Sequence, residues 1–235
     1  MIKVISILCV AAIILGMIGL TVFMLRRQKQ RHKSAFYQFA EQHNFTLLDT
    51  KAAIEPIYEA LKLFDFFRTG SNSRIRLLIQ GREGNAPVEI LLATLTHSGM
   101  NQGFTDEYAV IRWQHKRLHL PQFTLRPKGY AVERALNAVL VGEEPQVPLS
   151  GYPSLAKQYQ LTGTEPAAIH DLFSRELGGY LDAQVQHAIH RSFEGVENQF
   201  LYYTYLKDEI KIDELNQLYE ESKHVLKLLE QAFAS

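Results

Sequence analysis

The sequence predicts an α+β fold, in which a mostly antiparallel sheet packs against helices and one long helix lies at the C-terminus. Three strand-like segments follow one another through turn-rich connections, and apolar residues recur at helical spacing before and after them. The strict strand–helix alternation of a doubly wound sheet is missing. The 235 residues are 46% hydrophobic with one cysteine, which excludes a disordered chain, a collagen-like chain and a disulfide-built miniprotein.

The first 33 residues predict a single transmembrane helix. Val4–Leu25 contains 22 residues without a charge, and a helix of that length spans about 33 Å, enough for a hydrocarbon core of about 30 Å. A signal peptide is the alternative, but its apolar region would be about 7–15 residues long and would end in a small-residue cleavage site. The run ends instead in a basic collar that is expected to contact lipid headgroups. The collar consists of Arg26, Arg27, Lys29, Arg31 and Lys33.

The distribution of Lys and Arg predicts the orientation of this span. Five basic residues follow it, whereas only Lys3 and the terminal amine precede it. Because the more basic side stays in the cytoplasm, we expect a single-pass protein of the inner (cytoplasmic) membrane with a cytoplasmic soluble part. Residues 1–33 then form the anchor and collar, and residues 34–235 form one soluble α+β domain. That length suffices for a core without metal or disulfides.

Hydropathy periodicity predicts the elements of the first half of the soluble part. Helices are expected at Ser34–His43 and Ala52–Phe64. The three strand-like segments, expected to form an antiparallel meander, are Arg74–Gly81, Val88–Thr96 and Glu107–Lys116. In the first of these, apolar residues alternate with polar ones, so one of its faces is expected to be exposed to solvent. Phe123–Leu125 lies between two prolines and is expected to form a short edge strand.

The second half is expected to be richer in helices. The expected helices are Ala131–Val141, Glu165–Glu176 and Ile212–Phe233, and the expected strands are Tyr159–Thr162, Val185–Phe193 and Gln199–Tyr205. The last helix has a broad apolar stripe that Ser222 interrupts, which favours packing on the chain's own sheet. Pairing with a second copy is the alternative. Its acidic residues, including Glu221, are expected to face solvent.

Missing motifs exclude several chemistries. The sequence has no P-loop, dinucleotide-binding, zincin, hydrolase-elbow or paired-cysteine motif, and it therefore predicts no cofactor. Beyond the collar and Lys3 there are 19 basic and 25 acidic residues, and nucleic-acid binding would need a concentrated positive field instead. We therefore expect no nucleic-acid partner.

One dense cationic cluster lies outside the collar. It contains His115, Lys116, Arg117, His119 and Arg126, with Lys128 close by in the sequence. Two histidines four residues apart bind a metal well on a helix, but this segment leaves a strand, so no metal site is expected. An anion-binding patch and a solvated strand end both remain open. His187 and His190 are expected to be surface residues.

Several short segments together resemble a group of uncharacterised bacterial proteins that often carry one N-terminal membrane span. The resemblance rests on Phe64, Phe67, Gly70, Gly81, Leu120–Pro127 (LPQFTLRP), Tyr159–Gly163 (YQLTG), Leu172-Phe173, Glu194-Gly195 and Leu201–Tyr203. It covers roughly Phe36–Leu229 and implies turn and core positions, with no activity attached.

These observations predict a membrane-anchored, non-enzymatic binding or scaffold protein. Its expected partners are the lipid bilayer and a protein, with a second copy of the chain as a further candidate. The alternative is an enzyme with a motif-free polar site near His115, His119 and Arg126.

Overall fold

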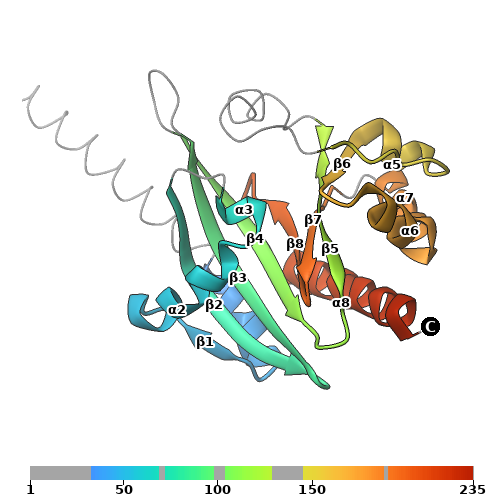
Figure 1. Ribbon diagram of the computed structural model, residues 1–235. Coiled ribbons are helices and arrows are strands. Elements are labelled where there is room, and N and C mark those ends of the chain that lie inside the picture. Colours follow the sequence, from blue (N-terminus) through green and yellow to red (C-terminus); the bar gives the residue numbers. More distant parts are fainter. Residues whose placement is uncertain (1–32, 69–71, 98–103, 129–144, 188–189, 235) are drawn as a thin grey trace, which may run out of the picture.

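A computed structural model describes residues 33–68, 72–97, 104–128, 145–187 and 190–234. It confirms the α+β fold, with eight antiparallel strands in the order β1-β2-β3-β4-β8-β7-β5-β6 and a long C-terminal helix (Figure 1). The strands are β1 (Thr46–Leu48), β2 (Asn72–Glu83), β3 (Ala86–His97), β4 (Phe104–Gln114), β5 (Leu120–Pro127), β6 (Tyr159–Gly163), β7 (Ser192–Glu197) and β8 (Gln199–Tyr205). The helices are residues 33–42, α2 (Lys51–Leu61), α3 (Asp65–Arg68), α5 (Pro153–Gln158), α6 (Pro166–Ser174), α7 (Glu176–Gln186) and α8 (Ile212–Ala234).

The predicted membrane span, Val4–Leu25, lies outside the described residues. So do four collar residues (Arg26, Arg27, Lys29 and Arg31) and the expected helix Ala131–Val141, whereas Lys33 begins the first described helix. Among the helices within the described ranges, none combines the length and the apolar character needed to cross a bilayer.

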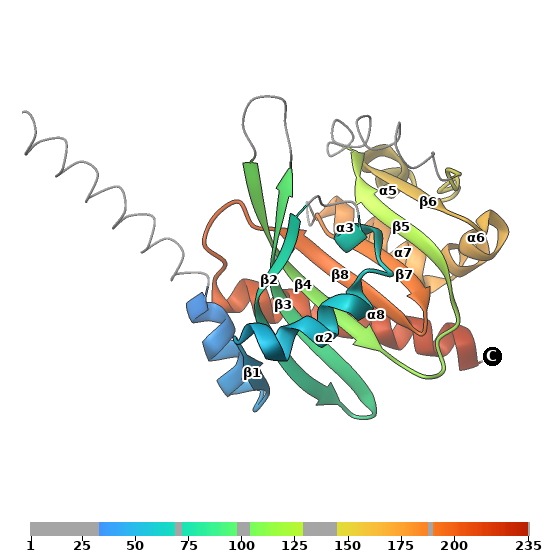
Figure 2. The ribbon, with the colours of Figure 1, turned by 60° about the vertical axis from the view of Figure 1, so that its left-hand side comes forward.

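Both faces of the sheet are covered (Figure 2). Helix 33–42 and α5 to α8 pack on one face, where they enclose the larger apolar core, and α2 and α3 pack on the other. The meander of β2, β3 and β4 is confirmed. The expectation that one face of β2 is exposed is wrong, because Leu78 is fully buried in the core beneath α2. Alternation in one strand could not reveal that a helix covers its second face.

β5 is an interior strand, so its assignment as an edge is wrong. It pairs with β6 on one side and with β7 on the other. A proline normally disfavours an interior strand because it lacks the N–H donor. Here Pro121 lies where the register between β5 and β7 shifts, and Pro127 ends the strand. Neither proline therefore interrupts the central part of the ladder.

The predicted strand Val185–Phe193 is also wrong in its first half. Val185 lies in α7, whose buried side includes Leu177 and Leu181. The strand begins only at Ser192 and continues to Glu197, so the turn before β8 falls later than expected. Over so few residues, the hydropathy pattern of a helix end with a few apolar residues cannot be told apart from that of a short apolar strand. The predicted strands Tyr159–Thr162 and Gln199–Tyr205 are confirmed.

The C-terminal helix packs on the chain's own sheet, as predicted. Leu215, Leu218 and Leu226 are buried in the larger core. Ser222 is also fully buried, and its Oγ accepts a hydrogen bond of 2.9 Å from the indole nitrogen of Trp113 on β4. The expectation that every acidic residue of this helix faces solvent is wrong for Glu221, which is buried and paired with Arg191 at 2.8 Å.

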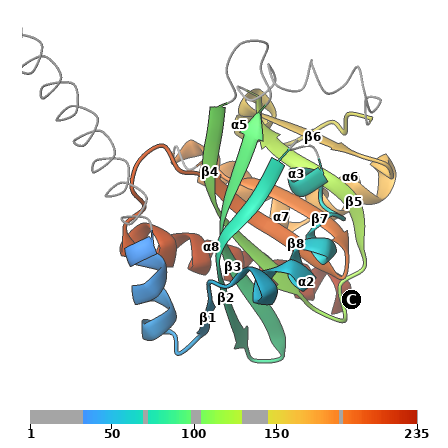
Figure 3. The ribbon, with the colours of Figure 1, turned by 90° about the vertical axis from the view of Figure 1, so that its left-hand side faces the viewer.

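Helix 33–42 is part of the core and not a flexible tether. Phe36 and Phe39 are fully buried, and the ring of Phe39 meets that of Tyr219 on α8 edge-on with centroids 5.3 Å apart. Asn216 of α8 accepts a hydrogen bond of 3.2 Å from the imidazole of His43. Figure 3 shows this helix alongside the N-terminal part of α8. The segment that follows the predicted anchor is therefore fixed to the folded part.

We expect Phe39→Ala to lower the free energy of unfolding by about 3–5 kcal/mol, because it leaves a cavity between two helices and the sheet. Urea unfolding of the full chain in detergent micelles measures this change through the fluorescence of Trp113, the one tryptophan, whose ring stacks on Tyr219. Tyr37→Ala is the matched control on the same helix, since Tyr37 is 45% exposed. Equal effects of the two substitutions would show that this helix is not part of the core.

Candidate functional site

The structure divides the five predicted patch residues between two places. Lys116, Arg117 and His119 are exposed in the turn between β4 and β5. His115 lies at the base of this turn with its Nε2 3.4 Å from Oε1 of Glu230 on α8, and its Nδ1 is buried without a hydrogen-bond partner. Both histidines lie near the end of α8, since the ring of His119 meets Phe233 edge-on at 6.5 Å.

Arg126 is not part of this group. It lies six residues along β5 from Leu120, which corresponds to roughly 20 Å of strand, and its contacts are on the sheet face covered by α3. Four of the predicted residues therefore surround the β4–β5 turn, and the fifth belongs to a different cluster. Anion binding by the group at the turn stays a prediction.

A surface depression of about 500 Å³ lies beside the β4–β5 turn. Lys116 and His119 line it, together with two carboxylates, Glu165 before α6 and Glu197 in the β7–β8 turn. The remaining lining residues are Leu118, Leu120, Pro121, Ala168 and Asn198. The sequence pointed to the lysine and the histidine. It did not point to the two glutamates, which reach this place from distant parts of the chain.

The backbone at Glu197 is strained. Val196 pairs with Gln199, so Glu197 and Asn198 form a two-residue hairpin turn, and Glu197 has a φ of 54°. Such left-handed conformations cost a residue other than glycine about 1–2 kcal/mol, and hairpin turns of this length favour Gly or Asn at such a position. Strained residues of this kind are concentrated at functional sites, which makes Glu197 a candidate functional residue.

A buried polar cluster surrounds Arg126. Its Nε donates to the hydroxyl of Tyr203 at 3.0 Å, and its Nη2 pairs with Glu194. Glu194 also accepts hydrogen bonds from the Tyr203 hydroxyl at 2.6 Å and from the backbone N–H of Phe66 at 3.1 Å. Thr124 on β5 donates to Asp65 of α3 at 3.1 Å. This cluster therefore attaches α3 to β5, β7 and β8.

The electrostatics of this cluster stabilise the charged pair and the neutral phenol. Burial lowers the pKa of Arg126, but Tyr203 and Glu194 outweigh this effect, so the pKa is raised overall. Burial also raises the pKa of Tyr203 well above its usual 10, with Arg126 opposing the change and Glu194 reinforcing it. Arg126 therefore stays charged and Tyr203 stays neutral, so neither side chain is prepared to transfer a proton near neutral pH.

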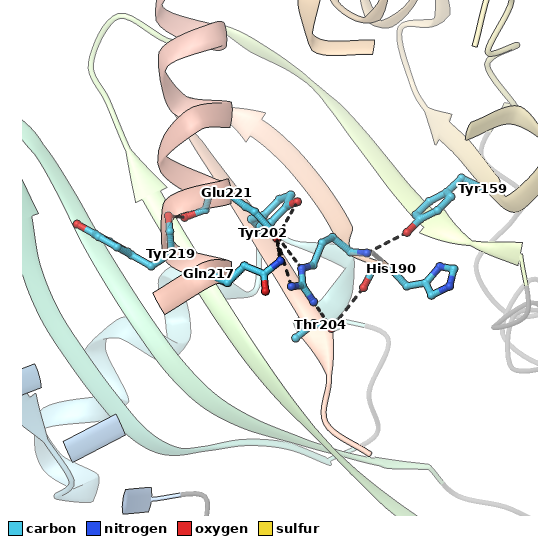
Figure 4. Close-up of polar contacts among 9 residues, drawn as sticks. Tyr159, His190, Tyr202, Thr204, Gln217, Tyr219 and Glu221 are labelled. Carbon is cyan, nitrogen blue, oxygen red and sulfur yellow. Dashed lines mark hydrogen bonds and ion pairs between the residues drawn. The ribbon is translucent and has the colours of Figure 1, made fainter. Parts of the chain in front are cut away.

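A second polar cluster lies under α8 (Figure 4). Arg191 donates to Glu221 through Nε at 2.8 Å, and its backbone N–H donates to the hydroxyl of Tyr159 at 2.9 Å. Tyr202, fully buried, donates to Glu221 at 3.5 Å, and Thr204 donates to the carbonyl of His190 at 3.3 Å. Figure 4 shows Tyr202 and Glu221 on one side of the cluster and Tyr159 on the other. The hydrogen bonds of this cluster therefore connect α8 with β8 and with the start of β6.

This second cluster also keeps its tyrosines neutral. Burial raises the pKa of Tyr159 to about 12, although the neighbouring Arg191 lowers it. Tyr180 of α7 lies close enough to be affected by Glu221, and burial and then this charge raise its pKa to about 12. No group of three or more His, Cys, Asp or Glu side chains in the described part of the chain is arranged to hold a metal ion. Within that part, the polar side chains of each cluster form hydrogen bonds with one another.

Comparison of the chain with protein-family models, with curated proteins and with solved structures finds no match. The resemblance drawn from the sequence therefore stays a prediction. The function is inferred from the geometry of the described residues.

We expect the Arg126–Glu194 pair to show strong energetic coupling. Removing one partner of a buried ion pair costs about 3–5 kcal/mol, because the other charge stays buried without compensation. Arg126→Met and Glu194→Gln should each destabilise the fold by that amount, and the double variant should lose less than the sum. Urea unfolding of the four proteins measures the cycle. The exposed pair of Lys62 and Glu59 is the control and should show no measurable coupling.

We expect stability to fall between pH 10 and pH 12. Unfolded tyrosines ionise near pH 10, whereas Tyr159 and Tyr180 ionise at about 12 in the fold. A raised folded-state pKa gives stability that is complete below pH 10 and is lost as the pH rises through 12. Phenolate absorbance of the folded protein should show a late titration step, which Tyr159→Phe and Tyr180→Phe each reduce. Identical titrations in buffer and in urea would contradict the assignment.

Proposed function

We propose that this chain is a membrane-anchored, non-enzymatic binding or scaffold protein whose folded part lies close to the cytoplasmic face of the inner membrane. The observation that carries the proposal is the burial of helix 33–42 in the core. Only residues 26–32 separate this helix from the predicted span Val4–Leu25. A segment of that length reaches less than about 30 Å even when fully extended.

The polar groups of the structure support binding over catalysis. The two buried clusters around Arg126 and Glu221 connect elements of the fold to one another. The depression at the β4–β5 turn is open to solvent, whereas catalytic sites gain much of their electrostatic effect by excluding water. The predicted enzyme site would need Arg126 beside His115 and His119, and these lie on opposite faces of the sheet.

The proposal includes two kinds of partner. The basic collar, from Arg26 to Lys33, fits the anionic surface of the cytoplasmic leaflet, where each basic residue contributes about 1 kcal/mol of attraction. The folded part provides the surface that the protein partner contacts. From Ala131 onward the chain has 16 acidic and 8 basic residues, which supports a protein partner and not a nucleic acid.

We expect the full chain to sediment with membranes and to resist extraction by carbonate, whereas a chain that begins at Lys33 should stay in the supernatant. A fluorescent protein fused after Ser235 should be bright, and alkaline phosphatase at the same position should be inactive, because fusions there report the cytoplasmic side. An active phosphatase with a dark fluorescent fusion would reverse the orientation. A full chain that stays soluble, or that loses residues 1–25 in its mature form, would contradict the anchor itself.

A further inference from the structure

We propose that the depression beside the β4–β5 turn binds a peptide segment of a partner protein that carries one acidic and one basic side chain. The proposal rests on the binding function proposed above and assigns it a place and a ligand chemistry. Its four central residues are Lys116, His119, Glu165 and Glu197.

The charges of the depression are not used by the fold. All four side chains are exposed, and within the described residues none of them forms an ion pair or a side-chain hydrogen bond. Because the positive and negative side chains of the depression do not pair with one another, a ligand that carries both a positive and a negative group can form an ion pair with each of them. Lys116 would pair with an acidic side chain, and Glu165 and Glu197 would pair with a basic one.

The shape of the depression favours a peptide over a small molecule. Its volume of about 500 Å³ is within the range of about 300–1,000 Å³ for ligand sites. Small-molecule sites, however, enclose about 70–90% of their ligand, and this depression is wide open. A segment of a protein needs no such enclosure, because the rest of the partner contacts the surrounding surface. Pro121 and Ala168 add apolar surface to the lining of the depression.

The backbone of Glu197 provides an independent argument. Glycine would adopt the φ of 54° at this turn position without strain. The chain instead has a carboxylate there, which lines the depression. A residue that strains the fold and offers its side chain to a surface site is expected where the side chain has a function.

The depression also lies where a partner can reach it. In the first half of α8, the side-chain amide of Asn216 donates a hydrogen bond of 3.3 Å to the side-chain oxygen of Gln42 in helix 33–42. Near the end of α8, the ring of Phe233 contacts the ring of His119. The 17 residues of helix between these contacts correspond to about 25 Å. The depression is therefore displaced along α8 from the helix that follows the predicted anchor, so the bilayer would leave it accessible.

The experiment uses the full chain in lipid nanodiscs and a phage-displayed library of random dodecapeptides, with empty nanodiscs as the background. We expect enriched peptides to carry an acidic and a basic residue within four positions. A fluorescein-labelled copy of the most enriched peptide should bind at least tenfold more weakly to Glu197→Gln and to Lys116→Gln. Glu176→Gln and Lys157→Gln, both exposed elsewhere, are the matched controls and should bind normally.

Glu197→Gly separates the binding role from the structural one. Because glycine relieves the strain of the turn, this variant should have a higher melting temperature and should still lose peptide binding at least tenfold. No enrichment over empty nanodiscs, or equal binding to Glu197→Gln, would overturn the proposed site. If that happens while the full chain stays in the membrane fraction, the site fails and the proposed membrane-anchored function is unaffected.

Discussion

The contact between Trp113 and Ser222 determines how the long C-terminal helix lies on the sheet. The indole N–H of Trp113 is fully buried and therefore needs an acceptor. The Ser222 hydroxyl accepts that bond at 2.9 Å and donates to the carbonyl of Tyr219 at 2.8 Å. The Trp113 ring also stacks on Tyr219, with centroids 5.8 Å apart. A serine within an apolar stripe thus fixes the position of the helix along its axis and its rotation about that axis, which apolar packing alone would leave less specific.

Several other contacts depend on this placement of α8. Tyr219 presents its ring to Phe39, so helix 33–42 can enter the core. Glu221, next to Ser222, points to Arg191 at the start of β7. At the other end of the helix, Arg175 donates to the carbonyl of Ala232 at 2.5 Å, which provides a cation where the helix dipole is negative. One helix therefore connects the segment after the predicted anchor with the surface around the β4–β5 turn.

The sequence predicted the elements whose evidence is local and missed the contacts that join distant segments. The periodicity of α8 and the limits of β8 could be read directly, because each depends on spacing within one segment. The burial of Glu221 could not, since its partner Arg191 is 30 residues away. The two prolines of β5 likewise led to the wrong prediction of an edge strand. The rule that proline favours edge strands uses only the local sequence, and it cannot show that the pairing register with β7 shifts at Pro121.

The cluster around Arg126 gives a physical account of the segments on which the predicted resemblance rests. LPQFTLRP and YQLTG form the neighbouring strands β5 and β6, with Leu125 opposite Leu161. A Cβ on Gly163 would lie 2.3 Å from the carbonyl oxygen of Gln122, and one on Gly195 would lie 2.3 Å from the ring of Phe123. Such close approaches, together with the Arg126–Glu194 pair, constrain the residue types at these positions through packing alone, independently of function. The side chains of the candidate site have no comparable packing constraint, because they are exposed to solvent. Sequence patterns in this chain therefore report mainly how β5, β6 and β7 pack, and the proposed binding function has to be tested in the turns that those strands support.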